Sequence, residues 1–205
     1  MFIGRERELT ALKEWYDKDG IGMMVIYGRR RIGKSTLITE FAKGKRTIFY
    51  TATKIGKNRN LELFSKQVVD LLMPGLGEVR FPATEAVFDF IDKNMGSEKI
   101  VLVIDELPYW AERDEALLSV LQKYMDTVWN DKNLKIILCG SALSFMEKKV
   151  LSEKSPLFGR RDSQMKLDAF DYLDSAKFVP DYSNEDKAIC YGITGGIAKY
   201  LSMID

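Results

Sequence analysis

The sequence predicts an α/β fold in which helices cover a parallel sheet on both faces. Short runs rich in apolar and β-branched residues recur along the chain, and segments with amphipathic helical periodicity separate them. Strands that are buried on both faces have this nearly continuous apolar character, and their alternation with helices is typical of a parallel sheet. The expected strands cover residues 23–28, 46–51, 100–105, 134–140 and 163–170.

Helical periodicity accounts for the segments between the first three strands. A helix over residues 34–42 follows the glycine-containing turn after the first strand, and further helices are expected over about 60–73 and 83–94. Apolar residues recur there three and four positions apart, which places them on one side of a helix. They are Leu61, Phe64, Val68, Leu71 and Leu72 in one segment, and Ala86, Phe90 and Ile91 in the other.

The second half of the chain continues the alternation. A long helix is expected over residues 113–129, because its apolar residues are spaced by three and four. Ser144 and Ser183 each stand three residues before an acidic residue, which is the spacing of a helix N-terminus. The Gly195-Gly196 pair is expected to end the last of these helices. The apolar side of the long helix consists of Leu117, Leu121, Tyr124 and Val128.

Composition excludes several classes of protein. The chain has 205 residues, of which 46% are hydrophobic, so it can form one domain with a substantial core. It contains no histidine, which excludes Ser-His-Asp and Cys-His catalysis and zinc bound by histidine. Cys139 and Cys190 form no CxxC pair and lie among apolar neighbours, so we expect core residues of a cytoplasmic protein. The longest aliphatic run, residues 100–104, is too short to cross a bilayer, and the N-terminus lacks the apolar stretch of a signal peptide. No membrane partner is therefore expected.

Positive charge is concentrated in one block of the chain. Residues 20–61 contain ten Lys and Arg residues and a single acid, Glu40, although the net charge of the whole chain is only +1. A basic block within an acidic remainder predicts an anionic ligand nearby. That ligand could be a phosphate compound or a nucleic acid, and individual side chains of the block could equally lie on solvated faces.

A phosphate-binding motif directly follows the first strand. Residues 28–35, GRRRIGKS, fit the pattern GxxxxGK[ST] between an expected strand and an expected helix. In such a loop the backbone N–H groups cradle phosphates, Lys34 reaches the β- and γ-phosphates, and the Ser35 hydroxyl ligates Mg²⁺. The arginine side chains at 29–31 are expected to point away from the phosphates, because the backbone does the cradling. The nucleotide-binding residues expected here are Gly28, Arg31, Ile32, Gly33, Lys34, Ser35 and Thr36.

Polar residues also end two later strands. Asp105 and Glu106 follow a run of apolar residues, which is the Walker B arrangement. Asp105 would hold Mg²⁺ through water, and Glu106 would orient the attacking water or accept its proton. Ser141 ends the strand at 134–140, so it is expected at the same edge of the sheet, beside the γ-phosphate or the attacking water. For all three residues, the alternative is a structural role in capping the turn that follows.

Arg160 and Arg161 lie in the segment SPLFGRR, before the last expected strand. An exposed Gly-Arg-Arg sequence suits an arginine finger, which neutralises charge in the transition state. We take Arg160 as the candidate catalytic residue, acting within the chain or supplied by a neighbouring copy through self-association. The alternative is an ordinary solvated or salt-bridged pair of arginines.

Six segments occur in an order that resembles one known family. They are FIGREREL (2–9), GRRRIGKS (28–35), VIDELPYW (103–110), LCGSALSFM (138–146), SPLFGRR (155–161) and YGITGGIAKYL (191–201). Together they resemble the archaeal-type ATPase family, in the STAND branch of the AAA+-related P-loop ATPases. The resemblance implies a three-layer P-loop NTPase sandwich with five parallel strands in the order 5-1-4-3-2. It also implies that Phe2, Ile3, Gly4 and Arg5 lie against the adenine.

These observations predict a Mg²⁺-dependent ATPase module that converts ATP to ADP and phosphate and acts as a nucleotide-driven switch. The expected division is an ATPase core over residues 1–194 and the start of a truncated helical lid over 195–205. Two other functions remain open. One is a non-hydrolysing scaffold that binds nucleotide, or binds nucleic acid through residues 20–61. The other is a small-molecule kinase, which would use the same phosphate-binding loop.

Overall fold

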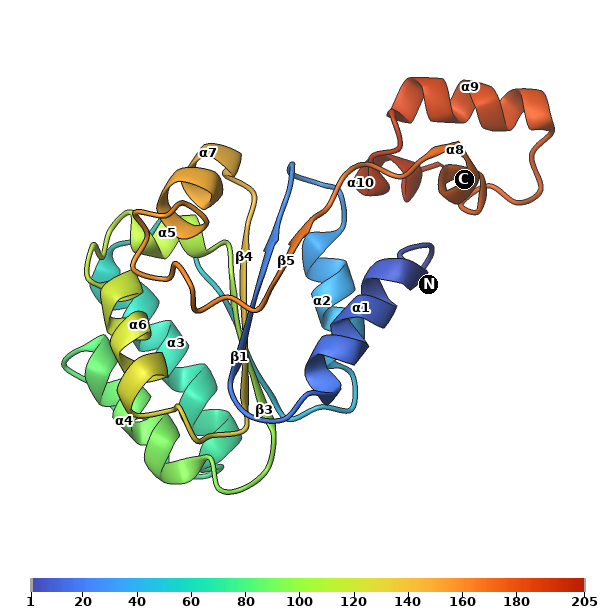
Figure 1. Ribbon diagram of the computed structural model, residues 1–205. Helices are drawn as coiled ribbons and strands as arrows, with labels where there is room; N and C mark the ends of the chain where they lie inside the picture. Colours follow the sequence, from blue (N-terminus) through green and yellow to red (C-terminus); the bar gives the residue numbers. More distant parts are fainter. Residues whose placement is uncertain (1, 205) are drawn as a thin grey trace.

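The computed structural model describes residues 2–204 and shows a three-layer α/β architecture (Figure 1). All strand pairs are parallel, and the strands follow the order β2-β3-β4-β1-β5. This confirms the expected order 5-1-4-3-2, counted from the other edge of the sheet. Met1 and Asp205, the outer limits of the expected domains, lie outside the described residues. The strands are β1 (Gly22–Tyr27), β2 (Thr47–Thr51), β3 (Ile100–Asp105), β4 (Leu134–Gly140) and β5 (Ser163–Lys166).

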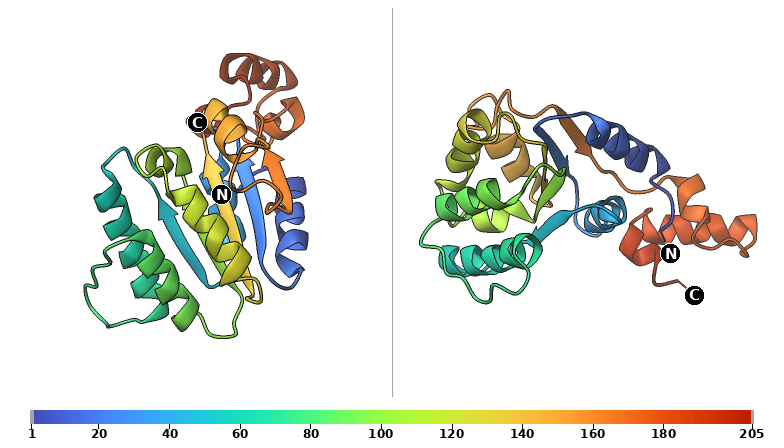
Figure 2. Two further views of the ribbon diagram at one scale, coloured as in Figure 1. Left: turned by 60° about the vertical axis from the view of Figure 1, so that its left-hand side comes forward. Right: turned by 90° about the horizontal axis from the view of Figure 1, so that it is seen from below.

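Helices cover both faces of the sheet, as Figures 1 and 2 show. They are α1 (Glu6–Asp17), α2 (Lys34–Ala42), α3 (Lys57–Leu72), α4 (Thr84–Asn94), α5 (Leu107–Ala111), α6 (Leu117–Thr127), α7 (Leu143–Phe145) with a π-helical turn at Met146–Val150, α8 (Tyr172–Ala176), α9 (Asn184–Thr194) and α10 (Ala198–Leu201). Helices α3 to α6 lie on one face, and α1 and α2 lie on the other. Among residues 2–204, no helix is both long and apolar enough to span a membrane.

The central strand β3 illustrates why these runs of apolar residues fold as buried strands. Ile100, Leu102 and Ile104 pack in the core under α3 to α6. Val101 and Val103 point the other way, into the core under α1 and α2. Because side chains alternate along a strand, a strand buried on both faces carries apolar residues at nearly every position.

The long helix expected over residues 113–129 is wrong at its start. The structure has a separate short helix, α5, directly after Glu106, and α6 begins only at Leu117. Between them, the N–H of Asp114 donates to the carbonyl of Trp110, and the carbonyl of Asp114 accepts from Leu117 N. The buried Asp114 carboxylate also accepts a hydrogen bond of 3.0 Å from Lys57 in α3. The turn therefore depends on a polar tertiary contact, which apolar periodicity does not reveal.

The fifth strand is also shorter than expected, because it ends with its neighbour. β5 lies at the edge of the sheet beside β1, whose last residue is Tyr27. The N–H of Leu167 donates to the Tyr27 carbonyl at 2.7 Å. Beyond this bond no strand is left to pair with, and the chain leaves the sheet past the loop that follows β1.

Two helix starts test the capping signatures. At Ser183 the prediction is confirmed, because Asp186 N donates to Ser183 Oγ at 3.1 Å and Gly195 follows the helix in a left-handed conformation. At Ser144 the prediction is wrong. Helix α7 starts one residue earlier, has no side-chain cap and passes into the π-helical turn.

Helices α8, α9 and α10, here termed the C-terminal helices, lie beyond the carboxyl edge of the sheet on the side of α1 and α2 (Figures 1 and 2). They have a small core of their own, formed by Phe170, Val179, Cys190 and Leu201. This core takes residues from both sides of position 194. The chain thus begins to pack into this second core at about residue 170. The expected boundary between the ATPase core and the lid, at residue 194, stays a prediction.

The C-terminal helices are tied to the segment after β5 at one close backbone contact. The N–H of Phe170 donates to the Gly196 carbonyl at 2.8 Å. A Cβ atom on Gly196 would lie 2.0 Å from the carbonyl oxygen of Phe170, and Gly196 has φ +69°. Both the space and the backbone conformation therefore require glycine.

We expect Gly196→Ala to lower the free energy of unfolding by more than about 2 kcal/mol, because it adds a backbone clash to left-handed strain. Gly192→Ala is the matched control, since a Cβ there meets nothing within 4 Å and lies in helix α9. It should leave stability unchanged or raise it by roughly 0.5–1 kcal/mol. Urea unfolding of both variants provides the measurement, and equal midpoints would contradict the assignment.

Candidate nucleotide-binding site

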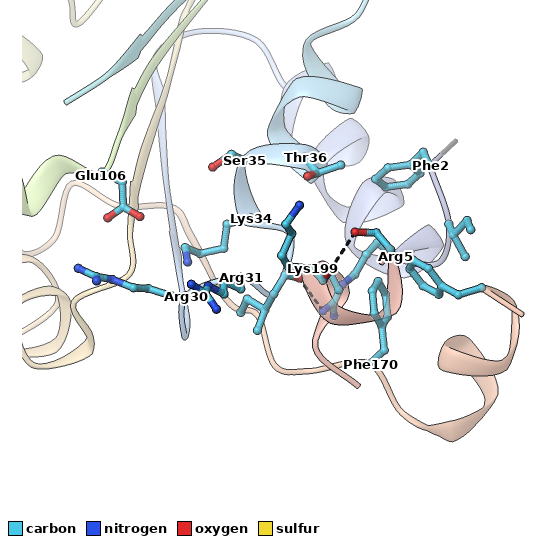
Figure 3. Close-up of a pocket in the computed structure, with 16 residues that line it drawn as sticks. Phe2, Arg5, Arg30, Arg31, Lys34, Ser35, Thr36, Glu106, Phe170 and Lys199 are labelled. Atoms are coloured by element: carbon cyan, nitrogen blue, oxygen red, sulfur yellow. Dashed lines mark hydrogen bonds between the residues drawn. The ribbon is translucent and has the colours of Figure 1, made fainter. Parts of the chain in front are cut away.

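The loop between β1 and α2 forms one wall of a cavity of about 590 Å³ (Figure 3). The N-terminal segment, Glu106 and the C-terminal helices form the other walls. This volume lies within the usual range for small-molecule sites. Among the predicted site residues, those that line the cavity are Phe2, Ile3, Arg5, Arg31, Ile32, Gly33, Lys34, Ser35, Thr36 and Glu106. The predicted site residues outside this lining are Gly4, Gly28, Asp105, Ser141 and Arg160.

Lys34 begins helix α2 and is buried within the loop, with only 5% of its surface exposed. Its Nζ donates hydrogen bonds to the carbonyls of Gly28 at 3.0 Å and Arg29 at 2.9 Å. An ammonium group has three N–H donors. The loop therefore holds the charge in place and leaves one donor for a phosphate oxygen.

Four of the predicted polar residues meet at the carboxyl edge of the sheet. The Ser35 hydroxyl donates to Asp105 Oδ2 at 2.6 Å, and the other oxygen of Asp105 accepts from the N–H of Glu106 at 2.9 Å. Ser141 Oγ donates to Glu106 Oε2 at 2.8 Å, and Ser141 N adds a longer bond of 3.3 Å. The ends of β3 and β4 and the start of α2 thus form one connected polar set.

The donors at this edge fit a magnesium ion. Mg²⁺ prefers oxygen ligands and usually takes one or two from the protein, with water and phosphate completing the set. The Ser35 hydroxyl and the Asp105 carboxylate supply such a pair. Among residues 2–204, no group of three or more Asp, Glu, Cys or His residues could hold a metal. A metal at Ser35 and Asp105 would therefore depend on phosphate oxygens.

Cys139 lies beside this pair but does not compete for a metal. Burial raises the pKa of its thiol well above the usual value, and the negative charge of Asp105 raises that pKa further. Metals bind the thiolate form of cysteine. Cys139 thus stays a neutral core residue, in agreement with its expected role.

Aromatic side chains gather at the other end of the cavity, where Phe2 and Arg5 lie opposite Phe170 (Figure 3). Phe170 and Phe178 were not predicted as site residues. The sequence pattern places Phe170 in the last strand. Because β5 already ends at Lys166, Phe170 instead lies in the segment that lines the cavity. An aromatic-lined end suits a planar base, because aromatic rings can stack on its faces.

Arg5 holds this end of the cavity together. Its guanidinium lies 4.2 Å from the centre of the Phe170 ring and donates to Glu8 at 2.8 Å. It also donates to the carbonyls of Ile32, at 3.3 Å, and Asp168. Arg5 therefore connects the N-terminal segment with the phosphate-binding loop and with the segment after β5. The neighbouring Gly4 turns the chain against Phe170.

The three arginines of the loop point in different directions, and the expectation that they point away from the phosphates stays a prediction. Arg30 and Arg31 line it, whereas Arg29 lines a second cavity on the side of β5. Arg30 donates to the hydroxyl of Tyr109 at 2.6 Å, and Arg31 donates to that of Tyr200 at 3.0 Å. Successive side chains of a tightly turning loop diverge, and therefore neighbours in sequence reach different elements.

Arg160 is held away from the cavity within this chain. Its guanidinium donates to both carboxylate oxygens of Asp126 in α6, with a shortest distance of 2.8 Å, and to the carbonyl of Phe158. These hydrogen bonds lower the pKa of the Asp126 carboxyl. Arg161 donates to the carbonyl of Leu151 at 2.6 Å. The structure thus favours the salt-bridged alternative within one chain, and a finger from a neighbouring copy stays a prediction.

Backbone strain is concentrated at this cavity. Within residues 2–204, the residues other than glycine with positive φ are Arg5 at 66°, Arg31 at 69° and Glu106 at 50°. All three line the cavity. Such conformations cost about 1–3 kcal/mol each and persist only where surrounding contacts hold them. Their clustering is typical of a functional site.

Comparison with known proteins agrees with this geometry. Residues 2–204 match the family described as an ATPase domain predominantly from Archaea. The chain belongs to this family. It is 32% identical over 204 residues to a protein of Methanocaldococcus jannaschii, and the match covers all of this chain but 44% of that relative. The chain thus spans less than half the length of this relative.

Two solved structures share the fold of this archaeal ATPase domain. A Walker-type ATPase of Pyrococcus abyssi aligns with a TM-score of 0.69 and 22% identity, over 98% of this chain and 65% of that one. The ORC2 protein of Aeropyrum pernix aligns with a TM-score of 0.66 and 17% identity, over 92% of this chain and 54% of that one. At these identities the likeness shows the fold.

We expect Lys34→Ala to weaken the binding of Mg²⁺-ATP by at least about 10-fold, because a charge-assisted hydrogen bond to phosphate is lost. Lys43→Ala is the matched control, since this lysine follows the same helix and pairs with Glu40 on the surface. The measurement is the rise in melting temperature with increasing Mg²⁺-ATP. An equal rise in parent and Lys34→Ala would contradict the phosphate-binding assignment.

Proposed function

We propose that this archaeal ATPase domain binds ATP with Mg²⁺ and hydrolyses it to ADP and phosphate. One observation carries the proposal. Two hydrogen-bonded pairs lie next to each other beside the phosphate-binding loop. Ser35 pairs with Asp105 and Ser141 pairs with Glu106, and Asp105 and Glu106 are consecutive residues. A metal-holding pair next to an acid that can act on water is the arrangement that phosphoryl transfer to water requires.

In this proposal the loop and Lys34 hold the β- and γ-phosphates, and the aromatic end of the cavity takes the base. Ser35 and Asp105 would hold Mg²⁺, which neutralises phosphate charge when it is bound. The assignment of the base to Phe2, Ile3 and Phe170 rests on their place in the lining of the same cavity, where Phe2 and Phe170 lie at the end away from Glu106 (Figure 3).

Glu106 is proposed to act on the attacking water. Ser141 occupies its Oε2 through a hydrogen bond, which fixes the carboxylate and leaves Oε1 for water. As the water oxygen bonds to the γ-phosphorus, the bond from that phosphorus to the bridging oxygen breaks, and ADP departs. Glu106 accepts the proton that the water loses. Phosphate and ADP are the products.

A switch role is supported by the walls of the cavity. Ala198, Lys199 and Ser202 of the C-terminal helices line the same cavity as Lys34. The N–H of Lys199 donates to the carbonyl of Arg31 in the phosphate-binding loop at 3.1 Å. Binding or release of nucleotide would therefore change contacts that position these helices, which is how ligand binding shifts a conformational equilibrium.

The nucleic-acid alternative has weaker support. The basic block at residues 20–61 does not present one free positive surface, because several of its cations pair with acids. These pairs are Lys43 with Glu40, Arg46 with Glu98, Lys57 with Asp114, and Arg59 with Glu62. Lys34 is also buried inside the loop. Nucleic-acid binding therefore stays a prediction, which the salt dependence of any DNA affinity would test.

We expect Glu106→Gln to keep ATP binding and to slow turnover by roughly 10²-fold or more, the effect of losing a positioned general base. Glu112→Gln is the matched control, because Glu112 is exposed at the end of α5. Phosphate release is measured without any added acceptor, which also separates an ATPase from a kinase. Turnover of Glu106→Gln at the parental rate would make Glu106 a structural residue.

A further inference from the structure

Lys34 is one cation at the phosphate end of the cavity, and Lys199 of α10 also lines the cavity. Charge builds up on the oxygens of the transferred phosphoryl group, and arginine is well suited to neutralise it. Arg160 is occupied by Asp126 in this chain. The arginines that line the cavity are Arg5, Arg30 and Arg31. The question is which of these three is placed to act at the end where Glu106 lies.

Two of these three arginines have partners away from the end of the cavity where Glu106 lies. Arg5 packs on Phe170 and is 8% exposed, at the aromatic end of the cavity. Arg31 donates to Tyr200, and its guanidinium lies 5.6 Å from the centre of that ring. Both side chains therefore serve the contact with the C-terminal helices and the segment that leads to them.

Arg30 alone extends toward the end of the cavity that Glu106 occupies (Figure 3). Its Nη2 donates to the hydroxyl of Tyr109 at 2.6 Å. Tyr109 lies in the first turn after Glu106, and its N–H donates to the Glu106 carbonyl at 3.0 Å. Lys54, in the loop that follows β2, lies 5.3 Å from the centre of the Tyr109 ring. The hydrogen bond to Tyr109 thus holds the Arg30 guanidinium against α5, the short helix that begins directly after Glu106.

We propose that Arg30 is a catalytic arginine supplied in cis by the phosphate-binding loop, with Tyr109 as its positioning residue. The inference rests on the proposed ATP hydrolysis. A guanidinium has five N–H donors, and the bond to Tyr109 uses one of them. The remaining donors contact the γ-phosphoryl oxygens as their negative charge increases. Arg30 stays protonated throughout and transfers no proton.

The test compares Arg30→Ala with Arg59→Ala. Arg59 lies in α3, pairs with Glu62 and is 56% exposed, so its replacement makes the same change in charge and size outside the cavity. We expect Arg30→Ala to lower turnover at least about 10²-fold, toward the ~10³–10⁵-fold effect of arginine fingers. Arg59→Ala should stay near the parental rate, and ADP affinity should be near parental in both. Arg30→Lys should recover only part of the loss, because lysine lacks the planar donor set.

A second measurement separates a transition-state contact from a structural role. ADP with Mg²⁺ and aluminium fluoride mimics the transferred phosphoryl group, and it should raise the melting temperature of the parent and of Arg59→Ala beyond ADP alone. This additional rise should be lost in Arg30→Ala. Tyr109→Phe removes only the hydroxyl that holds Arg30, and should lower turnover about 2- to 10-fold, as expected for one hydrogen bond.

The outcomes distinguish this inference from the proposed function. If the parent hydrolyses ATP and Arg30→Ala behaves like Arg59→Ala in both measurements, Arg30 is an ordinary surface arginine and the proposed function stands. If Arg30→Ala loses ADP affinity together with turnover, Arg30 binds the ground state and the catalytic assignment is wrong. A parent that does not hydrolyse ATP contradicts the proposed function and this inference together.

Discussion

The arrangement of the cavity depends on a close contact between two backbone segments at Gly28. β1 lies between β4 and β5, so the loop that follows it turns beside the ends of both strands. A Cβ atom on Gly28 would lie 2.2 Å from the carbonyl oxygen of Leu167 and 2.6 Å from Ile32 Cδ1. The absence of a side chain lets the segment after β5 pass directly over the loop. Because of this crossing, Phe170 and the C-terminal helices come to face the same cavity as Lys34.

The strained residues show how the cavity is held open for a ligand. Arg5, Arg31 and Glu106 each adopt left-handed backbone conformations, and each is held by a contact from another part of the chain. The carbonyl of Asp168 accepts from Arg5, the N–H of Lys199 donates to Arg31, and Ser141 donates to Glu106. The cost of this strain is offset by packing elsewhere, and the polar groups remain directed at the ligand. Pre-organisation of this kind reduces what a ligand must reorder on binding.

These contacts explain which features could be predicted from the sequence. The sequence predicts β3, β4 and α2 at their observed bounds, because buried strands are apolar at nearly every position and a helix needs only its periodic face. The phosphate-binding loop and the acids after β3 follow from local pattern. By contrast, the turn at Asp114, the early end of β5 and the role of Phe170 depend on partners far away in sequence. The divergence of Arg29, Arg30 and Arg31 has the same cause, since local pattern shows three adjacent cations but not their partners.

Arg30 and Arg31 are joined by one peptide bond, but their side chains have partners in different parts of the molecule. Arg30 is anchored to Tyr109, beside Glu106, and Arg31 is anchored to Tyr200 in the C-terminal helices. The loop between these anchors is short and strained at Arg31, so it has little freedom to absorb a displacement of one side chain without moving the other. In a nucleotide-driven switch, loss of the γ-phosphate would release Arg30 from its ligand, and the loop would carry that change to the carbonyl of Arg31 that Lys199 contacts. Under the proposed function, this loop would therefore couple hydrolysis to the position of the C-terminal helices.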